Sequence, residues 1–382
     1  MATQSFYIGS YTIADDWIPD ARGQGITRLR IDLESGGLRA EGVAAEIPNP
    51  SYLAPAADGK LLYACSELFH EDGKVWAFVI EPGGDLRPVS ERTSMGRATC
   101  HVSVDAARNR VFAASYLDGR VVAYEDDGAL LSESPAVFEY HGTGPNRARQ
   151  ESSHPHQVVM GHGAYFVPDL GADRIWIHDA APGTSGPTST AAPGTAGPDT
   201  SPRTFIETPP GCGPRHLVFH PELPLLYVVC ELEPRVLVYE RRPEATASGG
   251  GAASGGAGAT WAPVGDHSCE LPASAETAAP AAIKLHPSGR SLTVSNRLSD
   301  SLQQFTLDPD TGRLSPARNV HLPGKTPRDF GFSADGSRLI ALCQDSNEAF
   351  SYPVDAESGV MSEQPTDRIE IGTPVCVVAA GG

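Results

Sequence analysis

Histidine, arginine and carboxylate side chains that could transfer protons and bind anions recur in a few short phrases of this sequence. The phrase HPH places His154 and His156 on either side of a proline, and GPRH contributes Arg215 and His216. Histidine and carboxylate groups transfer protons, and arginine presents a planar set of donors to phosphate or carboxylate. Asp169, Glu231 and Arg297 stand at the ends of apolar runs, and Arg328 stands at the start of a predicted strand. Together these residue types predict acid–base chemistry on a small anionic substrate.

The elements that must position these residues are repeated along the chain. A degenerate phrase recurs about every 45 to 65 residues and begins at six places: Asn49, Ala98, His154, Gly213, Pro280 and Thr326. A seventh copy is split between the start of the chain (5–12 and 25–33) and its end (373–380). Such repeats, built from short β-branched runs with Gly, Asp and Pro turns, are typical of four-stranded propeller blades.

The predicted fold is therefore all-β: a seven-bladed β-propeller with four antiparallel strands per blade. The split copy predicts that the N- and C-terminal strands pair and close the ring. A ring of this size accounts for residues 1–382 as a single domain.

Within the copy that starts at Gly213, HLVF is the predicted first strand, LLYVVC the second and RVLVY the third. First and second strands are antiparallel, so the start of one and the end of the other lie at the same rim. His220 and His286 fall in turns at the opposite rim. The side chains predicted to converge on one mouth of the channel are Glu67, Tyr116, His154, His156, Asp169, Arg215, His216, Glu231, Asn296, Arg297, Arg328, Asp329 and Asp345.

Each of these residues also has a purely structural interpretation. The arginines could pair with neighbouring acids such as Glu231, and Asp169 could cap an Asx turn in DLGAD. Strand alternation predicts that the two rings of HPH point in different directions, without deciding which faces the channel. The sequence has no HxxxH, CxxC or EF-hand spacing and no Rossmann, P-loop or GxSxG motif. We therefore expect neither a metal nor a cofactor.

Composition excludes some classes of partner. The chain has 29 basic and 47 acidic residues and a net charge of −18, whereas nucleic acids and anionic membranes attract concentrated basic surfaces. The N-terminus resembles no signal peptide, and no 18-residue apolar run occurs. The seven cysteines are scattered, which predicts reduced and mostly buried thiols. We expect a soluble, cytoplasmic protein that is a monomer or a weak homo-oligomer.

Four segments interrupt or lengthen the repeats. Residues 181–202 and 243–262 consist almost entirely of Gly, Pro, Ser, Thr and Ala, and are interpreted as flexible surface insertions. Segments 15–25 and 141–153 are longer than a blade needs. The second carries Arg147 and Arg149 just before HPH, and is either a cover over the mouth with an added anion contact or an exposed mobile loop.

Several phrases resemble the lactonase family of seven-bladed propellers, which includes bacterial 6-phosphogluconolactonases and fungal carboxy-cis,cis-muconate cyclases. These phrases are HPHQV, VPDLGADRI, GPRHLVFHP with YVVCEL, LTVSNRLSDSL and TPRDFGFSADGSRLIALCQDSN. The resemblance covers the chain outside the two insertions. It implies a site made of one histidine of HPH, Arg215, Glu231 and Arg297. The family often has an acidic residue where this chain has Ala282.

The combined expectation is a lactone hydrolase, with 6-phosphogluconolactone as the first candidate substrate and with no cofactor. Glu231 or the channel-facing histidine (His154 or His156) would deprotonate water, and Arg215 would stabilise the oxyanion. The expected substrate-binding residues are Arg297, Arg328, His216 and Asp169. Two alternatives remain open: a muconate-lactonising enzyme, in which the arginines grip carboxylates, and a non-catalytic propeller that binds a partner on its faces.

Overall fold

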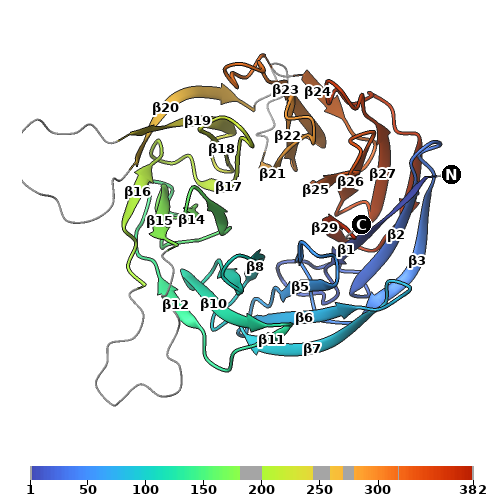
Figure 1. The fold of residues 1–382 in the computed structure, drawn as a ribbon, viewed down its shortest axis with the longest axis horizontal. Helices are drawn as coiled ribbons and strands as arrows, with labels where there is room; N and C mark the ends of the chain where they lie inside the picture. Colours follow the sequence, from blue (N-terminus) through green and yellow to red (C-terminus); the bar gives the residue numbers. More distant parts are fainter. Residues whose placement is uncertain (1, 181–199, 244–258, 270–278, 317, 381–382) are drawn as a thin grey trace, which may run out of the picture.

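The computed structural model describes residues 2–180, 200–243, 259–269, 279–316 and 318–380, whose strands form seven sheets arranged around a ring (Figure 1). Each sheet contains four antiparallel strands, and one of them carries an additional two-residue strand. The prediction of a seven-bladed β-propeller is confirmed. Among the described residues, no helix is long and apolar enough to cross a membrane.

We number the blades in chain order and name their strands from the centre of the ring outward. Blade 1 contains β29 (Pro374–Ala379), β1 (Thr3–Ser10), β2 (Ile26–Asp32) and β3 (Leu38–Ala45). Blade 2 contains β4 (Tyr52–Pro55), β5 (Leu61–Ser66), β6 (Lys74–Ile80) and β7 (Leu86–Thr93). Blade 3 contains β8 (Thr99–Asp105), β9 (Arg110–Ser115), β10 (Arg120–Asp127) and β12 (Ala136–Glu139), with β11 (Leu130–Leu131) paired to the end of β10.

The other four blades follow the same order. Blade 4 contains β13 (Val159–Gly161), β14 (Ala164–Asp169), β15 (Arg174–Asp179) and β16 (Thr204–Glu207). Blade 5 contains β17 (Pro214–Phe219), β18 (Leu225–Cys230), β19 (Arg235–Pro243) and β20 (Ala259–Ser268). Blade 6 contains β21 (Pro280–Leu285), β22 (Ser291–Asn296), β23 (Ser301–Thr306) and β24 (Arg318–His321). Blade 7 contains β25 (Pro327–Phe332), β26 (Arg338–Cys343), β27 (Glu348–Pro353) and β28 (Asp367–Glu370).

Apolar packing between neighbouring sheets holds the ring together. All six residues of β18 are buried, as the continuous apolar run LLYVVC predicts for a strand covered on both faces. Phe166 of blade 4 packs with Leu217 and Val228 of blade 5 in one such interface. Each large apolar side chain buried in this way stabilises the fold by about 1.5–3 kcal/mol.

One backbone hydrogen bond recurs in all seven blades and sets the geometry of the mouth. The residue that follows the second strand donates its N–H to the carbonyl of a residue just before the first strand, as Glu231 does to Gly213 (2.9 Å). The acceptor residue has positive φ in five blades, including Gly213 (φ 62°), where glycine adopts this conformation without steric cost. We call the seven donors the second-strand ring: Tyr11, Glu67, Tyr116, Leu170, Glu231, Arg297 and Gln344.

A β-bulge at the start of the first strand produces a further set of equivalent positions. In blade 5, Pro214 pairs with Cys230 and His216 with Val229, so Arg215 lies between them without a partner. Cys100 and Arg328 occupy the same unpaired position in blades 3 and 7. A bulge of this kind re-aims the extra side chain. We call the equivalent residues the first-strand ring: Ser51, Cys100, His156, Arg215, Ala281, Arg328 and Val375.

The insertion predicted at residues 243–262 is corrected at both ends, because Pro243 is the last residue of β19 and pairs with Ala259. Strand β20 already begins at Ala259 and pairs with the end of β19, so residues 259–262 belong to the sheet of blade 5. Trp261 packs against the apolar cluster between blades 4 and 5, which explains why a residue in this Gly/Ala-rich stretch is large and aromatic. Residues 181–199 and 244–258 lie outside the described part of the chain.

The predicted closure of the ring gives the first test. Strand β29 pairs with β1 from Phe6↔Ala379 to Ser10↔Pro374, and Val377 is buried in the core between blades 7 and 1. Ending the chain at Gly372 removes this strand and leaves the edge of β1 unpaired. We expect the melting temperature, followed by circular dichroism, to fall by roughly 10 °C or more. A synthetic peptide of residues 373–380 should restore it in a concentration-dependent way, and a truncated protein that melts like the intact chain contradicts the closure.

Candidate active site

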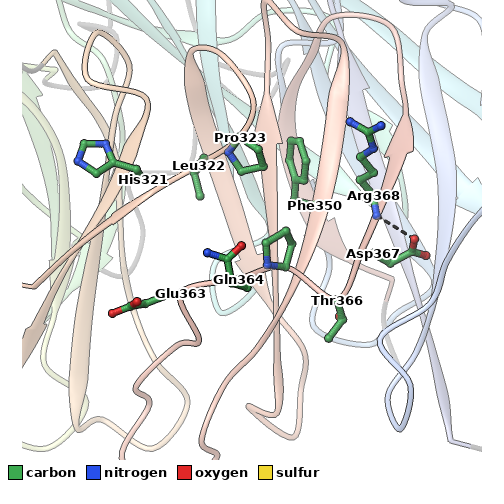
Figure 2. A pocket seen from close by; sticks show the side chains of 10 residues that line it. His321, Leu322, Pro323, Phe350, Glu363, Gln364, Thr366, Asp367 and Arg368 are labelled. Atoms are coloured by element: carbon green, nitrogen blue, oxygen red, sulfur yellow. Dashed lines mark hydrogen bonds between the residues drawn. The ribbon is translucent and has the colours of Figure 1, made fainter.

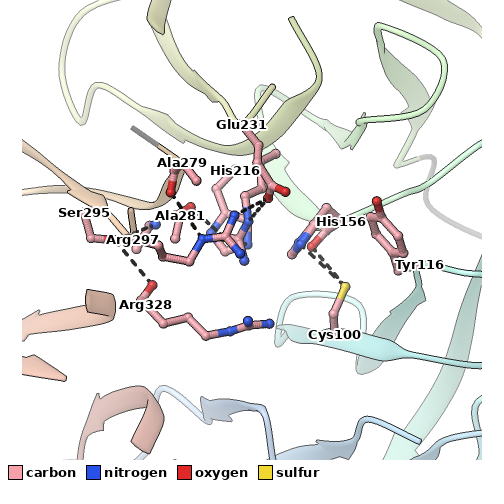
Figure 3. A network of polar contacts seen from close by, with 12 residues as sticks. Cys100, Tyr116, His156, His216, Glu231, Ala279, Ala281, Ser295, Arg297 and Arg328 are labelled. Carbon is pink, nitrogen blue, oxygen red and sulfur yellow. Dashed lines mark hydrogen bonds and ion pairs between the residues drawn. The ribbon is translucent and has the colours of Figure 1, made fainter. Parts of the chain in front are cut away.

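A cavity of about 340 Å³ opens at the mouth of the ring where the two rings of side chains meet. Its lining includes most of the second-strand ring together with Cys100, His156, Arg215 and Arg328 of the first-strand ring. Figure 3 shows Arg297 and Arg328 reaching toward the centre, with His156 and Cys100 on the facing side. The full lining is Tyr11, Trp17, Ile18, Glu67, Phe69, Ala98, Cys100, Tyr116, Leu117, Ala148, Arg149, Glu151, His154, His156, Arg215, Glu231, Arg297, Thr326, Arg328 and Gln344.

The buried carboxylate of Glu231 is surrounded by three guanidinium groups. Its Oε2 accepts from Nε of Arg215 (2.9 Å) and lies 2.8 Å from Nη2 of Arg297. Its Oε1 accepts from Nη2 of Arg149 (2.6 Å). Arg215 also donates to the carbonyl of Ala281, so its guanidinium is held from two sides. Three of the sequence-predicted residues, Arg215, Glu231 and Arg297, are therefore in direct contact.

These contacts determine the ionisation of the cluster. Burial alone would raise the pKa of Glu231, but the charges of Arg297, Arg215 and Arg149 outweigh it and hold the pKa well below its usual value. Burial and the nearby charge of Arg297 lower the pKa of Arg215 to about 10, so it remains protonated at neutral pH. Glu231 is thus a stable anion that organises the arginines around it, and its basicity is weak.

Arg328 and Glu67 form a second, looser charged pair in the same cavity. Nη2 of Arg328 is 3.9 Å from Oε2 of Glu67, beyond hydrogen-bond distance. The guanidinium of Arg328 lies over the ring of Tyr11, 5.3 Å from its centroid, and its Nη1 is 3.5 Å from Oε1 of Gln344. Among the four arginines of the lining, Arg328 has the most distant carboxylate partner. Its donors are the most available for an anion from solution.

The two histidines of HPH both line the cavity and differ in their partners. His154 stacks on Tyr116 (ring centroids 4.3 Å apart), its Nδ1 donates to the carbonyl of Tyr116 (2.8 Å), and its Nε2 is 3.1 Å from Oε1 of Glu151. His156 belongs to the first-strand ring, and its Nδ1 is 3.6 Å from Sγ of Cys100. Burial, together with the charge of Arg215, holds the pKa of His156 well below its usual value, so this ring is neutral.

His216, predicted to bind substrate, lies one layer below the cavity. The bulge directs Arg215 to the mouth and turns the next residue down the channel, where His216 packs against His156, His101 and Tyr52. Burial and the charge of Arg215 lower its pKa well below the usual value. Asp329, also predicted at the mouth, sits at the equivalent position in blade 7 and pairs with Lys284 (2.7 Å). Both residues support the floor of the site and do not line the cavity.

Asp169, the other predicted substrate-binding residue, also lies outside the cavity. It is the last residue of β14 and precedes Leu170 of the second-strand ring, so its side chain points into the blade. Its carboxylate is fully buried and accepts from five donors: the backbone N–H groups of His154, Gly171 and Ala172, the Trp176 indole and the Ser153 hydroxyl. Asp169 thus holds the HPH segment in place from outside the cavity.

Two loops complete the mouth. Segment 141–153 crosses it and is fastened by the buried Gln150, whose amide donates to the carbonyl of Leu170 and accepts from Asn146. Arg149 projects from this anchored loop to Glu231 and to the hydroxyl of Tyr116 (3.2 Å). The loop is thus anchored at the mouth by Gln150, residues 145–149 are exposed, and Arg149 contacts a carboxylate of the site.

The other long segment, 15–25, supplies an apolar wall that the sequence analysis did not assign to the site. Trp17 stacks on Phe69 with ring centroids 5.2 Å apart and is 55% exposed. Ile18 lies beside them in the lining. Aligning the seven copies residue by residue would have found Tyr11, Cys100 and Gln344, but Trp17 and Phe69 stand in loops that differ from blade to blade.

A larger hollow of about 600 Å³ lies on the outside of the ring, between the outer strands of blades 6 and 7 (Figure 2). Its charged and polar side chains, among them His321, Glu363 and Arg368, are spread along the wall and do not converge on one point. Leu322 and Phe350 line its apolar part. Volume alone therefore does not identify the site, whereas the convergence of charge does.

The charge of the mouth cavity is opposite to that of the whole protein. Four arginines line it (Arg149, Arg215, Arg297 and Arg328) against three glutamates (Glu67, Glu151 and Glu231), within a chain of net charge −18. Positive charge in a concave, partly dry site attracts an anionic ligand. No group of three or more metal-binding side chains occurs in the described part of the chain. The arrangement can bind a small anion, stabilise a developing oxyanion and transfer a proton.

Comparison with known proteins agrees with the fold. The sequence profile of the family described as "Lactonase, 7-bladed beta-propeller" matches residues 5–379. A 6-phosphogluconolactonase of Bacillus subtilis is 27% identical over 376 residues, 97% of each chain, and one of Formosa agariphila is 25% identical over 374 residues, covering 96% of this chain and 97% of its own. A solved structure of a periplasmic gluconolactonase from Pseudomonas aeruginosa superposes with a TM-score of 0.83 at 25% identity, with 99% of each chain covered.

The surroundings of Glu231 make its contribution to stability depend on pH. Its folded-state pKa is depressed, so the stability it provides is present above its unfolded value, about 4.3, and is lost as the pH falls further. We expect Glu231→Gln to be destabilised at pH 7, because three guanidiniums lose their counter-charge, and the difference from the parent to narrow below pH 4. Urea unfolding at several pH values measures this, with the exposed Glu133→Gln as control. A difference that is independent of pH contradicts the assignment.

Asp169 gives a second stability test. Asp169→Asn replaces an acceptor of five hydrogen bonds with a group that must present two donors to the same cage. We expect the free energy of unfolding to fall by about 2–4 kcal/mol. The exposed Asp16→Asn should stay within about 0.5 kcal/mol of the parent in the same denaturation experiment. Equal stability of the two variants would show that the carboxylate of Asp169 does not hold the HPH segment.

Proposed function

Because the chain belongs to the lactonase family of seven-bladed β-propellers, we propose that it hydrolyses a lactone that carries an anionic group. A sugar lactone with a phosphate, such as 6-phosphogluconolactone, is the first candidate, since the relatives from Bacillus subtilis and Formosa agariphila bear that name. The observation that carries the proposal is the set of four arginines lining a cavity of about 340 Å³ in an acidic protein. A neutral substrate would not need them.

In this proposal the role of each arginine follows from how closely its guanidinium is already paired with other groups of the protein. Arg215 is buried and held by Glu231 and by the carbonyl of Ala281, so its guanidinium is preorganised to stabilise the oxyanion of the tetrahedral intermediate. Arg328 has no carboxylate within 3.5 Å among the described residues, so it binds the anionic substituent. Arg297 and Arg149 hold Glu231 and close the wall.

A muconate-type lactonising activity remains the second candidate. The same four arginines that suit one phosphate also suit a substrate with several carboxylates. Both activities make or break an ester bond in a ring beside an anionic substituent, so the site chemistry alone does not separate them. A non-catalytic propeller that binds a partner on its faces gives no reason for a cavity at the mouth in which guanidiniums outnumber carboxylates.

The deciding experiment is a kinetic comparison on the purified protein. It uses 6-phosphogluconolactone, the unphosphorylated gluconolactone and 3-carboxymuconate, with spontaneous hydrolysis subtracted. We expect kcat/KM for the phosphorylated lactone to exceed that for the neutral lactone by at least tenfold. If the protein converts only 3-carboxymuconate, the cyclase proposal replaces the hydrolase proposal. If it converts none of the three substrates, the proposal that this site is catalytic fails.

The role of Arg328 can be tested in the same assay. Arg328→Ala removes a charged hydrogen bond worth about 1.5–3 kcal/mol, so the ratio of kcat/KM for the anionic lactone to that for the neutral lactone should fall roughly 10- to 150-fold. Arg39→Ala, which removes an exposed arginine far from the cavity, is the matched control for the lost charge. A ratio that changes equally little in both variants would exclude Arg328 as the anion anchor.

We also propose a cytoplasmic location, because seven scattered, buried cysteines without a disulfide suit a reducing compartment. The relative from Pseudomonas aeruginosa is described as periplasmic, so the compartment differs within this fold. Fractionation of cells that express the native chain decides between the two.

A further inference from the structure

Two glutamates occupy equivalent positions of the repeat in different blades. Glu67 follows LLYACS in blade 2, and Glu231 follows LLYVVC in blade 5. Both donate their backbone N–H to the residue before the first strand, at 3.0 Å and 2.9 Å, and both line the mouth cavity. Their backbones are thus alike, and any difference in chemistry comes from the neighbouring blades.

Those neighbours differ sharply. Glu231 stands beside Arg297 in the second-strand ring and above Arg215, and Arg149 covers it, so both of its oxygens are occupied by cations. Glu67 stands between Tyr11 and Tyr116, and its own blade has Ser51 where blade 5 has Arg215. Its Oε2 accepts from the hydroxyl of Tyr11 (2.7 Å), and among the described residues its Oε1 accepts no hydrogen bond. Glu67 is the buried carboxylate of the cavity with a free oxygen.

Two histidines also line the cavity, and both ring nitrogens of His154 already have partners. His156 is the remaining histidine, and its surroundings make it a weaker choice than Glu67. Protonating its ring would place a further positive charge beside Arg215, in a cavity where arginines already outnumber carboxylates. Protonating a carboxylate removes a negative charge and creates an acid that can later return the proton. Arg328 is near Glu67, so an anion held by Arg328 also lies near this carboxylate.

We propose that Glu67 is the group that takes the proton from the attacking water, with Tyr11 as its positioning residue; this rests on the proposed lactone hydrolysis. As the water oxygen bonds to the carbonyl carbon, its proton passes to the free Oε1 of Glu67 and the carbonyl electron pair moves to the oxyanion beside Arg215. The ring C–O bond then breaks, and Glu67 returns the proton to the departing alkoxide. The sum is lactone plus water giving a hydroxy acid, and Glu67 is regenerated.

Several groups face Glu67: the Tyr11 hydroxyl at the end of β1, Arg328 from β25, Cys100 from β8 and Cys65 from its own strand. Burial raises the pKa of Tyr11 well above its usual value, and the negative charge of Glu67 adds to this, so Tyr11 remains a donor across the working range.

The first test is substitution with chemical rescue. Glu67→Gln keeps the shape and should lower kcat on the preferred lactone by about 10²- to 10⁴-fold with a smaller change in KM. Glu67→Ala should be equally slow and should regain part of its kcat when sodium formate is added, because formate supplies the missing carboxylate. Glu231→Gln is the matched control at the equivalent repeat position, and formate should not restore it, since its function is to hold three arginines.

The second test is the pH profile of kcat. Tyr11→Phe removes a donor that favours the carboxylate, so the acid limb of the profile should move to higher pH. Tyr116 is the other neighbour of Glu67 in the second-strand ring, and its hydroxyl pairs with Arg149 and not with Glu67. Tyr116→Phe should therefore leave the acid limb at the same pH as in the parent. A merely structural effect of Tyr11 would lower kcat at every pH without moving the limb.

The outcomes separate this inference from the function on which it rests. If the parent hydrolyses an anionic lactone and Glu67→Gln stays within twofold of its kcat, the lactonase proposal survives and the role of Glu67 is excluded. A slow Glu67→Ala that formate does not rescue, together with an unmoved acid limb in Tyr11→Phe, also excludes it. If the parent hydrolyses no lactone, the proposed function fails first.

Discussion

The site depends on one backbone constraint that the propeller repeats in every blade. The N–H of the residue after each second strand donates to the carbonyl of a residue before the first strand, and in blades 1, 3, 5, 6 and 7 a bulge follows. The hydrogen bond brings two side chains per blade to the same rim whatever those side chains are. Ala281 and Leu170 hold this position as well as Arg215 and Glu231 do, so the backbone supplies the placement and the residue identities supply the chemistry.

Charge balance is the second constraint, because the arginines of the mouth repel one another in a partly dry cavity. Glu231 makes their approach possible: its two oxygens contact Arg149, Arg215 and Arg297 at 2.6–2.9 Å. A buried ion cluster of this kind adds little stability by itself, since the cost of desolvation offsets most of the attraction. Its value lies in fixing the directions of the guanidiniums. Arg328, left outside the cluster, retains donors for a ligand.

The sequence predicted the fold and most of the charged residues of the mouth, because both follow from the repeat. Arg215, Glu231, Arg297, Arg328 and both histidines of HPH were placed at one rim by strand order, and all line the cavity. Two predicted positions at the mouth differ from the structure, and in both cases a shift of one residue along the strand changes where the side chain points. Asp169 precedes the mouth-facing position by one residue and points into the blade, and the bulge sends His216 down the channel. Alternation along an ideal strand does not predict a bulge.

Contacts made by loops were beyond the sequence for a different reason: they depend on how far a segment without a repeat reaches across the ring. The sequence predicts that the segment carrying Arg149 either covers the mouth or is exposed, but the partner of Arg149 is a carboxylate 82 residues further along the chain. Glu67 illustrates the complementary case. Its position at the mouth follows from the repeat, but its difference from Glu231 depends on the adjacent blades. Glu67 has Tyr11 as its neighbour, whereas Glu231 has Arg297. In a ring of similar blades, therefore, the chemistry of a residue depends mainly on the side chains of the adjacent blades. The separation of these side chains in the sequence does not predict whether they are in contact.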